Sequence, residues 1–444
     1  MRARTFSITI LFFILLRVVF LTSLPIVTDE AIYMHWGSKF LTTWDDPQMP
    51  LSLQGKQAAT LLTLGISQLA PLDPLVAARL STVLFSLLVF LAFQSNSLAL
   101  LLLATSPLFL FFNRLAIPDT AVAASYTLAM VLAFKLQKKP TVLHSLLLGL
   151  TVAVGWWFKS TALLALPAIF FTVGIRGILP ILIALLFSIG LIQIPLLHRV
   201  VPLSQTEHVF TIAQLLAFPW TFWLNNVVMV LEAILIMSSP IALLAFFQNK
   251  IFKQKTLWIW FLTPVVSEIV LAKIFNLRYL IMAVPAFCLL LAFLLERKRI
   301  FSGIVVTTSL FLSVFMVVNP IGFYTSLTLL SSVKQDISQY VTGWASGWGV
   351  KETAEFLQNE AKSGPITVFV RLDSGNPESA MYVYLRNNKN IRILPITYLP
   401  SVPTISSYFV SRGTQYADLG DRLEEVIRFP KPLDNEFVGI YRIN

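Results

Sequence analysis

The chain has 444 residues, of which 56% are hydrophobic and only 12% are charged. A soluble globular chain is about 25% charged, so this composition excludes an ordinary soluble protein and indicates a polytopic membrane protein. The formal net charge of +11 would suggest nucleic acid as the partner of a soluble chain. Here Lys and Arg concentrate in short loops, where they set membrane topology, so no nucleic-acid partner is expected.

Apolar runs of near-bilayer length, about 20 residues each, recur from the N-terminus onward. The first is longer than a signal-peptide core of about 7–15 residues and lacks an A-x-A-like site, so it predicts a retained helix. The single cysteine, Cys288, lies in a later run and excludes an internal disulfide. The predicted spans are 7–27, 75–93, 98–112, 119–136, 141–158, 161–175, 178–197, 223–247, 256–274, 279–295 and 300–319.

The basic residues orient these eleven spans. Starting with Arg2 and Arg4 in the cytoplasm leaves the clusters at 135–139, 176, 250–255 and 297–299 on the cytoplasmic side. This is the bias that the positive-inside rule expects. The sequence therefore predicts a multi-pass protein of the plasma (inner) membrane, with its N-terminus in the cytoplasm and its C-terminus outside.

Two regions are not simple spans. The first outer loop, 28–74, contains two amphipathic segments, EAIYMHWGSKFLTTW and GKQAATLLTLGISQLA, which predict interfacial helices joined by the turn DDPQMP. The tail, 321–444, contains a helical segment, VKETAEFLQNEAK, and the strand-like segments PITVFVRL, NIRILPI, SSYFVSR and FVGIYRI. We therefore expect a membrane domain over 1–320, followed by a small extracytoplasmic α/β domain after the linker YVTGWASGWG.

The predicted topology gathers acids and bases at the outer membrane face, although none of them was used to choose the orientation. Charges beside apolar helices are costly unless they are paired or hydrated, so they are functional candidates by default. The set is Asp29, Glu30, Lys56, Arg114, Asp119, Lys159 and Arg278.

Asp29 and Glu30 follow Thr28 directly where the first span ends. One interpretation is helix capping, with Thr28 as N-cap and both acids near the positive end of the helix dipole. The other is a carboxylate that acts as general base and accepts the proton of an attacking hydroxyl. The two are compatible, because a capped helix start can also hold a catalytic side chain.

Arg114 and Asp119 flank a short turn between the third and fourth spans, in FFNRLAIPDTAVAA. They could serve as an interfacial anchor and a helix start after Pro118. Alternatively, Asp119 faces Asp29 across a cavity, where one acid orients the acceptor or binds a metal and the other takes the proton.

The remaining cations, Lys56, Lys159 and Arg278, lie at outer helix ends. Each alone is more often a side chain that snorkels to the interface. Converging with Arg114, they would form a pocket for the phosphate of a lipid carrier, because Arg offers a forked grip and Lys a point charge.

Other motifs are weak. No H-E-x-x-H, P-loop or G-x-G-x-x-G sequence occurs in a suitable context, which argues against nucleotide hydrolases and dinucleotide enzymes. His35 lies near Asp29 and fits an interfacial polar role better than a metal ligand. No cofactor is implied, and a divalent metal held by Asp29, Asp119 and His35 stays open.

Taken in order, these segments resemble the GT-C glycosyltransferases, above all the protein O-mannosyltransferases and the aminoarabinose transferase of lipid A. The resemblance covers about 15–300 and rests on TDEAIYMHW, GKQ, DPLVAARLSTVLFSLLVF, FFNRLAIPDTAVAA, GWWFKSTALLALP and NLRYLIMAVPAFCLLLAFLL. Thr28 departs from the family pattern, since proline is common at that position. The departure puts the subfamily in doubt and leaves the role of the acids intact.

The resemblance implies roles for individual residues. Asp29, with Glu30 adjacent, corresponds to the acid that acts as base or orients the acceptor, and Asp119 corresponds to the second acid. Lys56, Arg278 and Tyr279 best match the residues that hold the phosphate of a polyprenyl-phosphate sugar.

The reaction expected from these roles is an inverting transfer. A sugar on a polyprenyl phosphate would enter from the membrane lipid, and an acceptor hydroxyl or amine would enter from outside. Two other classes compete with this expectation. A flippase or transporter would distribute charges through the membrane midplane, and a scaffold would leave Asp29 and Asp119 without partners.

Overall fold

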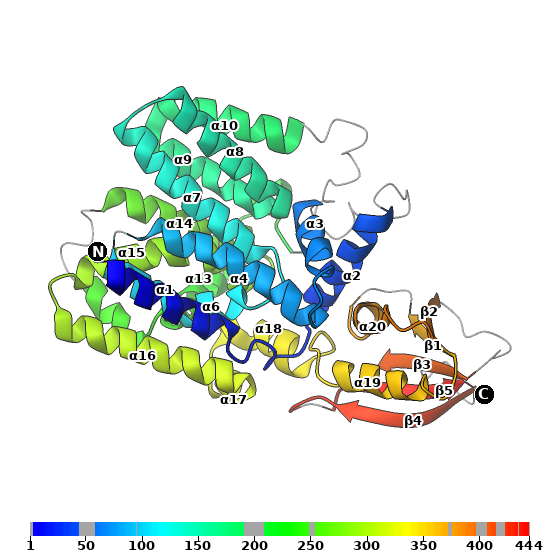
Figure 1. The fold of residues 1–444 in the computed structure, drawn as a ribbon. Helices are drawn as coiled ribbons and strands as arrows, with labels where there is room; N and C mark the ends of the chain where they lie inside the picture. The colour runs from blue at the N-terminus through cyan, green and yellow to red at the C-terminus, as the bar shows by residue number, and fades with distance from the viewer. Residues whose placement is uncertain are drawn as a thin grey trace.

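A computed structural model gives the structure of the chain. It describes residues 3–43, 58–94, 96–190, 208–247, 254–371, 375–396, 406–413, 422–433 and 435–443. Figure 1 shows a large helical body, which contains the N-terminus, and beside it a smaller α/β unit, which contains the C-terminus. The predicted division into a polytopic helical protein and a small C-terminal α/β domain is confirmed.

The helical body consists of apolar helices that enclose one large core. Among the described residues, five helices are long and apolar enough to cross a membrane, and shorter apolar helices accompany them. Large apolar side chains such as Leu84 and Phe311 lie exposed on the outer faces of these helices, as lipid-facing residues do. The helices of the body are α1 (Ala3–Val18), α4 (Pro74–Ala92), α5 (Ser97–Ala104), α6 (Pro107–Asn113), α7 (Asp119–Lys138), α8 (Val142–Phe158), α9 (Ala165–Val173), α10 (Ile178–Leu185), α12 (Ile212–Leu216), α13 (Trp220–Met237), α14 (Lys255–Leu271), α15 (Val284–Leu295) and α16 (Arg299–Val318).

Some of these helices are shorter than their apolar runs. The run 7–27 forms a helix only to Val18 and continues as an irregular linker to α2. The run 98–112 is two helices, because Ser106 caps α6 through the Phe109 amide and Pro107 occupies its first turn. Proline ends helices because it supplies no backbone N–H and clashes with the preceding turn.

The first outer loop forms the two predicted helices, α2 (Thr28–Thr43) and α3 (Ala58–Ser67). They cross at Gly37 and Gly65, where a Cβ added to Gly65 would lie 2.4 Å from the Gly37 carbonyl oxygen. Only glycine permits so close an approach of two backbones. The predicted turn DDPQMP lies outside the described residues.

The chain after the last membrane helix stays on the helical body before it leaves. This stretch contains α17 (Pro320–Ser326), α18 (Lys334–Ile337) and a π-helical turn, η10 (Ser338–Thr342). Tyr324 and Tyr340 are buried in the main core. The α/β unit has a separate core, whose first tail residue is Val350.

The α/β unit is a five-stranded mixed sheet with strand order β2-β1-β3-β5-β4. Strand β1 pairs in parallel with β2 and β3, whereas β5 pairs antiparallel with β3 and β4. The elements are α19 (Val350–Glu360), β1 (Ile366–Arg371), α20 (Glu378–Leu385), β2 (Ile391–Ile396), β3 (Ser407–Arg412), β4 (Leu423–Pro430) and β5 (Phe437–Ile443).

The α/β unit packs directly on the first outer loop, as α20 beside α2 in Figure 1 illustrates. Its core includes Ala31 and Met34 from that loop and Ile26 from the linker just before it. The Asn376 side chain donates to the Ile26 carbonyl at 2.9 Å and to the Ala345 carbonyl at 3.2 Å. The tail therefore helps to fix the start of α2, where the acidic pair lies.

Candidate active site

Glu30, not Thr28, supplies the side-chain cap of α2. The helix begins at Thr28 itself, and its first backbone bond runs from the Ala31 amide to the Val27 carbonyl at 2.9 Å. Val27 is therefore the N-cap residue, and its amide donates to Glu30 Oε2 at 3.0 Å. The hydroxyl of Thr28 instead accepts from the Asn376 amide at 3.3 Å. The predicted N-cap was wrong by one residue because a reach-back carboxylate from the third helical residue caps the N-cap amide.

Both oxygens of Glu30 are engaged in a buried ion pair with Arg79 of α4. The Arg79 fork donates from Nε to Oε1 at 2.8 Å and from Nη2 to Oε2 at 2.7 Å. Oε1 also accepts from the Ala116 amide at 2.6 Å, and both side chains are at most 1% exposed. Glu30 thus joins α2, α4 and the turn before α7, and it lies away from solvent.

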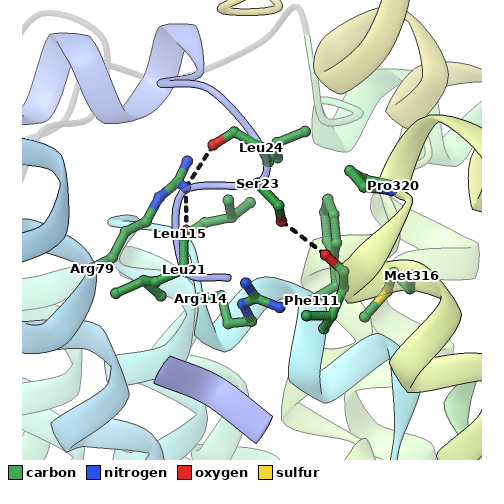
Figure 2. A pocket seen from close by; sticks show the side chains of 10 residues that line it. Leu21, Ser23, Leu24, Arg79, Phe111, Arg114, Leu115, Met316 and Pro320 are labelled. Carbon is green, nitrogen blue, oxygen red and sulfur yellow. Dashed lines mark hydrogen bonds between the residues drawn. The ribbon is translucent and has the colours of Figure 1, made fainter. Parts of the chain in front are cut away.

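Arg114 lies in a second buried group, behind the linker that joins α1 to α2. Its Nη2 donates to the carbonyls of Val19 and Phe20. Arg79 donates to three further linker carbonyls, those of Leu21, Leu24 and Pro25. Figure 2 shows both arginines at one small cavity beside this linker. Its volume of about 20 Å³ is enough for a single water molecule and too small for a phosphate group.

Asp29 points to a different group from that of its neighbour Glu30. Its Oδ2 forms an ion pair with Arg278 Nη1 and accepts from Gln339 Nε2 at 3.2 Å. The Asp29 side chain is 25% exposed and that of Arg278 is 16% exposed. A half-buried carboxylate that solvent can reach is suited to proton transfer, whereas the enclosed Glu30 is not.

Asp119 forms a second ion pair next to the first. It is the first residue of α7, and its Oδ1 accepts from Lys159 Nζ, at the end of α8, at 2.6 Å. Lys159 Nζ lies 4.4 Å from the centre of the Tyr279 ring, and Arg278 Cζ lies 5.3 Å from the same centre. Both cations therefore lie against the Tyr279 ring, and the two ion pairs belong to one cluster.

A buried acid, Glu268, stabilises the turn that carries Arg278, and it was not among the residues predicted from the sequence. Glu268 of α14 accepts from the Asn276 amide at 3.1 Å, and Asn276 Oδ1 accepts from the Arg278 amide at 3.1 Å. Asn226 of α13 donates to the Ala272 carbonyl at 2.9 Å, just after α14 ends. These bonds fix the backbone from which Arg278 and Tyr279 project.

A further acid, Asp336, is fully buried, and its carboxyl group interacts electrostatically with Arg278 of the cluster. Tyr324 donates to its Oδ2 at 3.3 Å. Burial raises the pKa of Asp336 to about 7, although the charge of Arg278 and the Tyr324 hydroxyl both act in the opposite direction. Desolvation, followed by the charge of Asp29, also raises the pKa of the Tyr33 hydroxyl on α2, which keeps it a hydrogen-bond donor.

Replacing Asp336 with Asn is expected to weaken the pH dependence of stability. Between pH 5 and pH 8 the variant should lose less stability than the wild type loses. Because the pKa of Asp336 is raised in the folded protein, the folded state holds more protons between about pH 4 and 7 than the unfolded state. The wild type therefore loses stability as the pH rises through this window, by an amount on the order of a few kcal/mol. Melting curves at several pH values measure this slope, and an identical slope in Asp336→Asn would contradict the assignment.

The structure thus brings together Asp29, Asp119, Lys159, Arg278 and Tyr279 from the predicted set. Glu30 and Arg114 lie in the buried groups described above, and Lys56 lies outside the described residues. His35 stacks on Tyr382 of α20, with ring centres 4.3 Å apart. Within the described residues, His, Cys, Asp and Glu side chains form no group of three that could hold a metal ion.

Comparison with known proteins supports the fold. No protein-family profile and no curated protein matches the chain. Among solved structures it is similar to ArnT from Cupriavidus metallidurans, bound to undecaprenyl phosphate at 12% identity and in the apo state at 13% identity. Each match has a TM-score of 0.61 and covers 98% of this chain and 97% of the other. The chain therefore has the fold of the GT-C glycosyltransferases, as the sequence resemblance implied.

Proposed function

We propose that this protein is a membrane glycosyltransferase that moves a sugar from a polyprenyl phosphate to an extracytoplasmic acceptor. The observation that carries the proposal is the cluster of two ion pairs, Asp29–Arg278 and Asp119–Lys159, joined through Tyr279. It supplies a half-buried carboxylate beside two cations, the groups needed for proton removal and for phosphate binding. The shared fold adds support, because ArnT has been solved bound to undecaprenyl phosphate.

In the proposed reaction the donor phosphate binds Arg278 and Lys159, and Lys56 joins them as the sequence suggests. Arg114 takes no part, since its guanidinium holds linker carbonyls. A phosphate that draws Arg278 away leaves Asp29 with less positive charge beside it, which increases the basicity of its carboxylate. Donor binding would thereby prepare the base before the acceptor arrives.

The chemical step is a displacement at the anomeric carbon. The acceptor oxygen or nitrogen forms the new bond, its proton passes to Asp29, and the bond to the phosphate oxygen breaks with inversion. Arg278 and Lys159 stabilise the negative charge that grows on the leaving phosphate, which favours the transition state. Asp119 holds Lys159 in place through its 2.6 Å bond.

The same proposal assigns the sides of the membrane. The cluster and the α/β unit would lie outside the inner membrane, and the N-terminus would lie in the cytoplasm, as the basic loops predict. The acceptor would then approach Asp29 from outside the membrane.

The direct test incubates the full-length protein with polyprenyl-phosphate sugars and candidate acceptors in lipid vesicles. We expect free polyprenyl phosphate to appear only when a suitable acceptor is present. Movement of intact donor across the vesicle membrane without cleavage would instead favour the flippase.

Replacing Arg278 with Ala is expected to raise the apparent KM for the donor about 10- to 100-fold, the usual effect of losing a hydrogen bond to a charged group. Arg278→Lys should recover part of the loss, because it restores the charge without the fork. Arg176→Ala is the matched control, since Arg176 is an exposed arginine in the turn that follows the C-terminal end of α9. Initial rates at varied donor concentration measure the effect, and an unchanged KM would remove Arg278 from the phosphate site.

A further inference from the structure

Gln339 touches the proposed base and carries a buried acceptor atom that has no partner. Its Nε2 donates to Asp29 Oδ2 at 3.2 Å. Its Oε1 is buried and accepts no hydrogen bond in the part of the chain that the structure describes. The orientation of the amide is determined by Asp29, because the flipped amide would set a carbonyl oxygen against a carboxylate oxygen.

A buried carbonyl oxygen without a hydrogen-bond donor lowers the stability of the folded protein, so its presence calls for an explanation. Leaving such an atom unsatisfied is unfavourable, and native structures contain few examples. Gln339 also lies in a π-helical turn, η10, and such turns occur frequently at functional sites. The neighbouring residue Tyr340 packs in the main core, where its ring centre lies 5.0 Å from that of Phe111, so the position of the turn is fixed.

We propose that Gln339 is a substrate-binding residue whose Oε1 accepts a hydrogen bond from a hydroxyl or amino group next to the reacting centre. The inference rests on the proposed function. A hydroxyl nucleophile has one proton, which passes to Asp29, so Oε1 then binds a neighbouring hydroxyl of the sugar. An amine nucleophile has a second N–H, and Oε1 binds that group instead.

The buried position of Oε1 is compatible with this role. The atom becomes accessible only if a neighbouring side chain moves, and the ion pair that shares Asp29 Oδ2 with Gln339 is the contact that a donor phosphate would open. Gln339 would then keep Asp29 oriented through Nε2 after Arg278 has turned to the phosphate. One amide would thus hold the base and bind the substrate.

The test compares Gln339→Met and Gln339→Leu, two neutral replacements, with the wild type in two measurements. The first is binding of undecaprenyl phosphate with and without an attached hexose, and the second is turnover with an acceptor. We expect both variants to bind bare undecaprenyl phosphate like the wild type and to lose about 10- to 100-fold in kcat/KM, since a hydrogen bond beside a charged group is lost. Gln335→Met is the matched control, because Gln335 is exposed four residues earlier.

The outcomes separate the possibilities. Weaker binding of the hexose-bearing lipid alone assigns Oε1 to the donor sugar, and normal lipid binding with a raised KM for the acceptor assigns it to the acceptor. A lower kcat with lipid binding and acceptor KM both unchanged would reflect only the lost Nε2 bond to Asp29 and would overturn the inference. A purely structural Gln339 would weaken binding of bare undecaprenyl phosphate and lower the melting temperature, which would overturn the inference. So would variants that match the wild type in both measurements. If the wild type itself binds neither lipid, the proposed function fails first and this inference falls with it.

Discussion

Replacing Asp29 with Asn is expected to lower kcat about 10²- to 10⁴-fold, the usual contribution of a positioned general base. Asn keeps the shape of the side chain and an oxygen for Arg278 and Gln339, but it cannot accept the proton of the nucleophile. Because Asp29 is 25% exposed, the folded protein should lose little stability. Single-turnover rates and melting temperatures of the same preparation measure both quantities.

Asp73→Asn is the matched control for this variant. Asp73 is the N-cap of α4, with its carboxylate accepting from the Leu75 and Val76 amides, and Asn caps a helix about as well. The same chemical change there should leave turnover unchanged. Wild-type turnover in Asp29→Asn, or an equal loss in Asp73→Asn, would remove Asp29 as the base.

The sequence predicted the elements whose apolar residues recur with a clear periodicity and the apolar segments that are long enough to cross a bilayer. The apolar runs became the helices of the body, and the four strand segments rich in branched and aromatic residues became β1, β2, β3 and β5. Strand β4 was missed because it is an edge strand, LEEVIRFP, whose charged residues resemble a loop. Helix α20 was missed because its eight residues, ESAMYVYL, are too few for a periodic pattern.

The candidate site was predictable in part, because membrane topology limits which charges can meet. The topology assigned from the basic loops placed four residues on one membrane face, and in the structure they form two ion pairs: Asp29 with Arg278 and Asp119 with Lys159. The side of the membrane on which a residue lies does not show which of the other residues on that side it contacts. Arg114 belongs to the same face yet bonds the linker of α1 and α2, a contact set by the path of an irregular segment.

Of the two residues that support the cluster, Gln339 had no signal in the sequence and Glu268 had one that was not used. Gln339 meets Asp29 across 310 residues, and the short, irregular stretch after the last span shows no motif. Glu268 stands alone in an apolar helix, where an acid is costly and functional by default. That rule would have found Glu268, although not its bond to the Asn276 amide.

Replacing Glu30 with Gln is expected to destabilise the protein by about 3–5 kcal/mol, the usual cost of breaking a buried ion pair from one side. The change leaves Arg79 buried with an uncompensated charge. It also turns an amide N–H toward the guanidinium or toward the amides of Val27 and Ala116, which both need acceptors. Denaturation followed by loss of helical signal in detergent measures the change.

Glu355→Gln is the matched control, because Glu355 pairs with Lys351 at 4.0 Å on an exposed face where both side chains are 61% exposed. Such surface pairs contribute about 0–1 kcal/mol, so this variant should melt like the wild type. Arg79→Met should be at least as destabilising as Glu30→Gln, because three linker carbonyls lose their donor together with the carboxylate. A stable Glu30→Gln protein that has lost turnover would instead make Glu30 a catalytic residue. Otherwise the two adjacent acids have different roles: we expect Asp29 to control turnover, whereas Glu30 and Arg79 hold the linker that leads into α2.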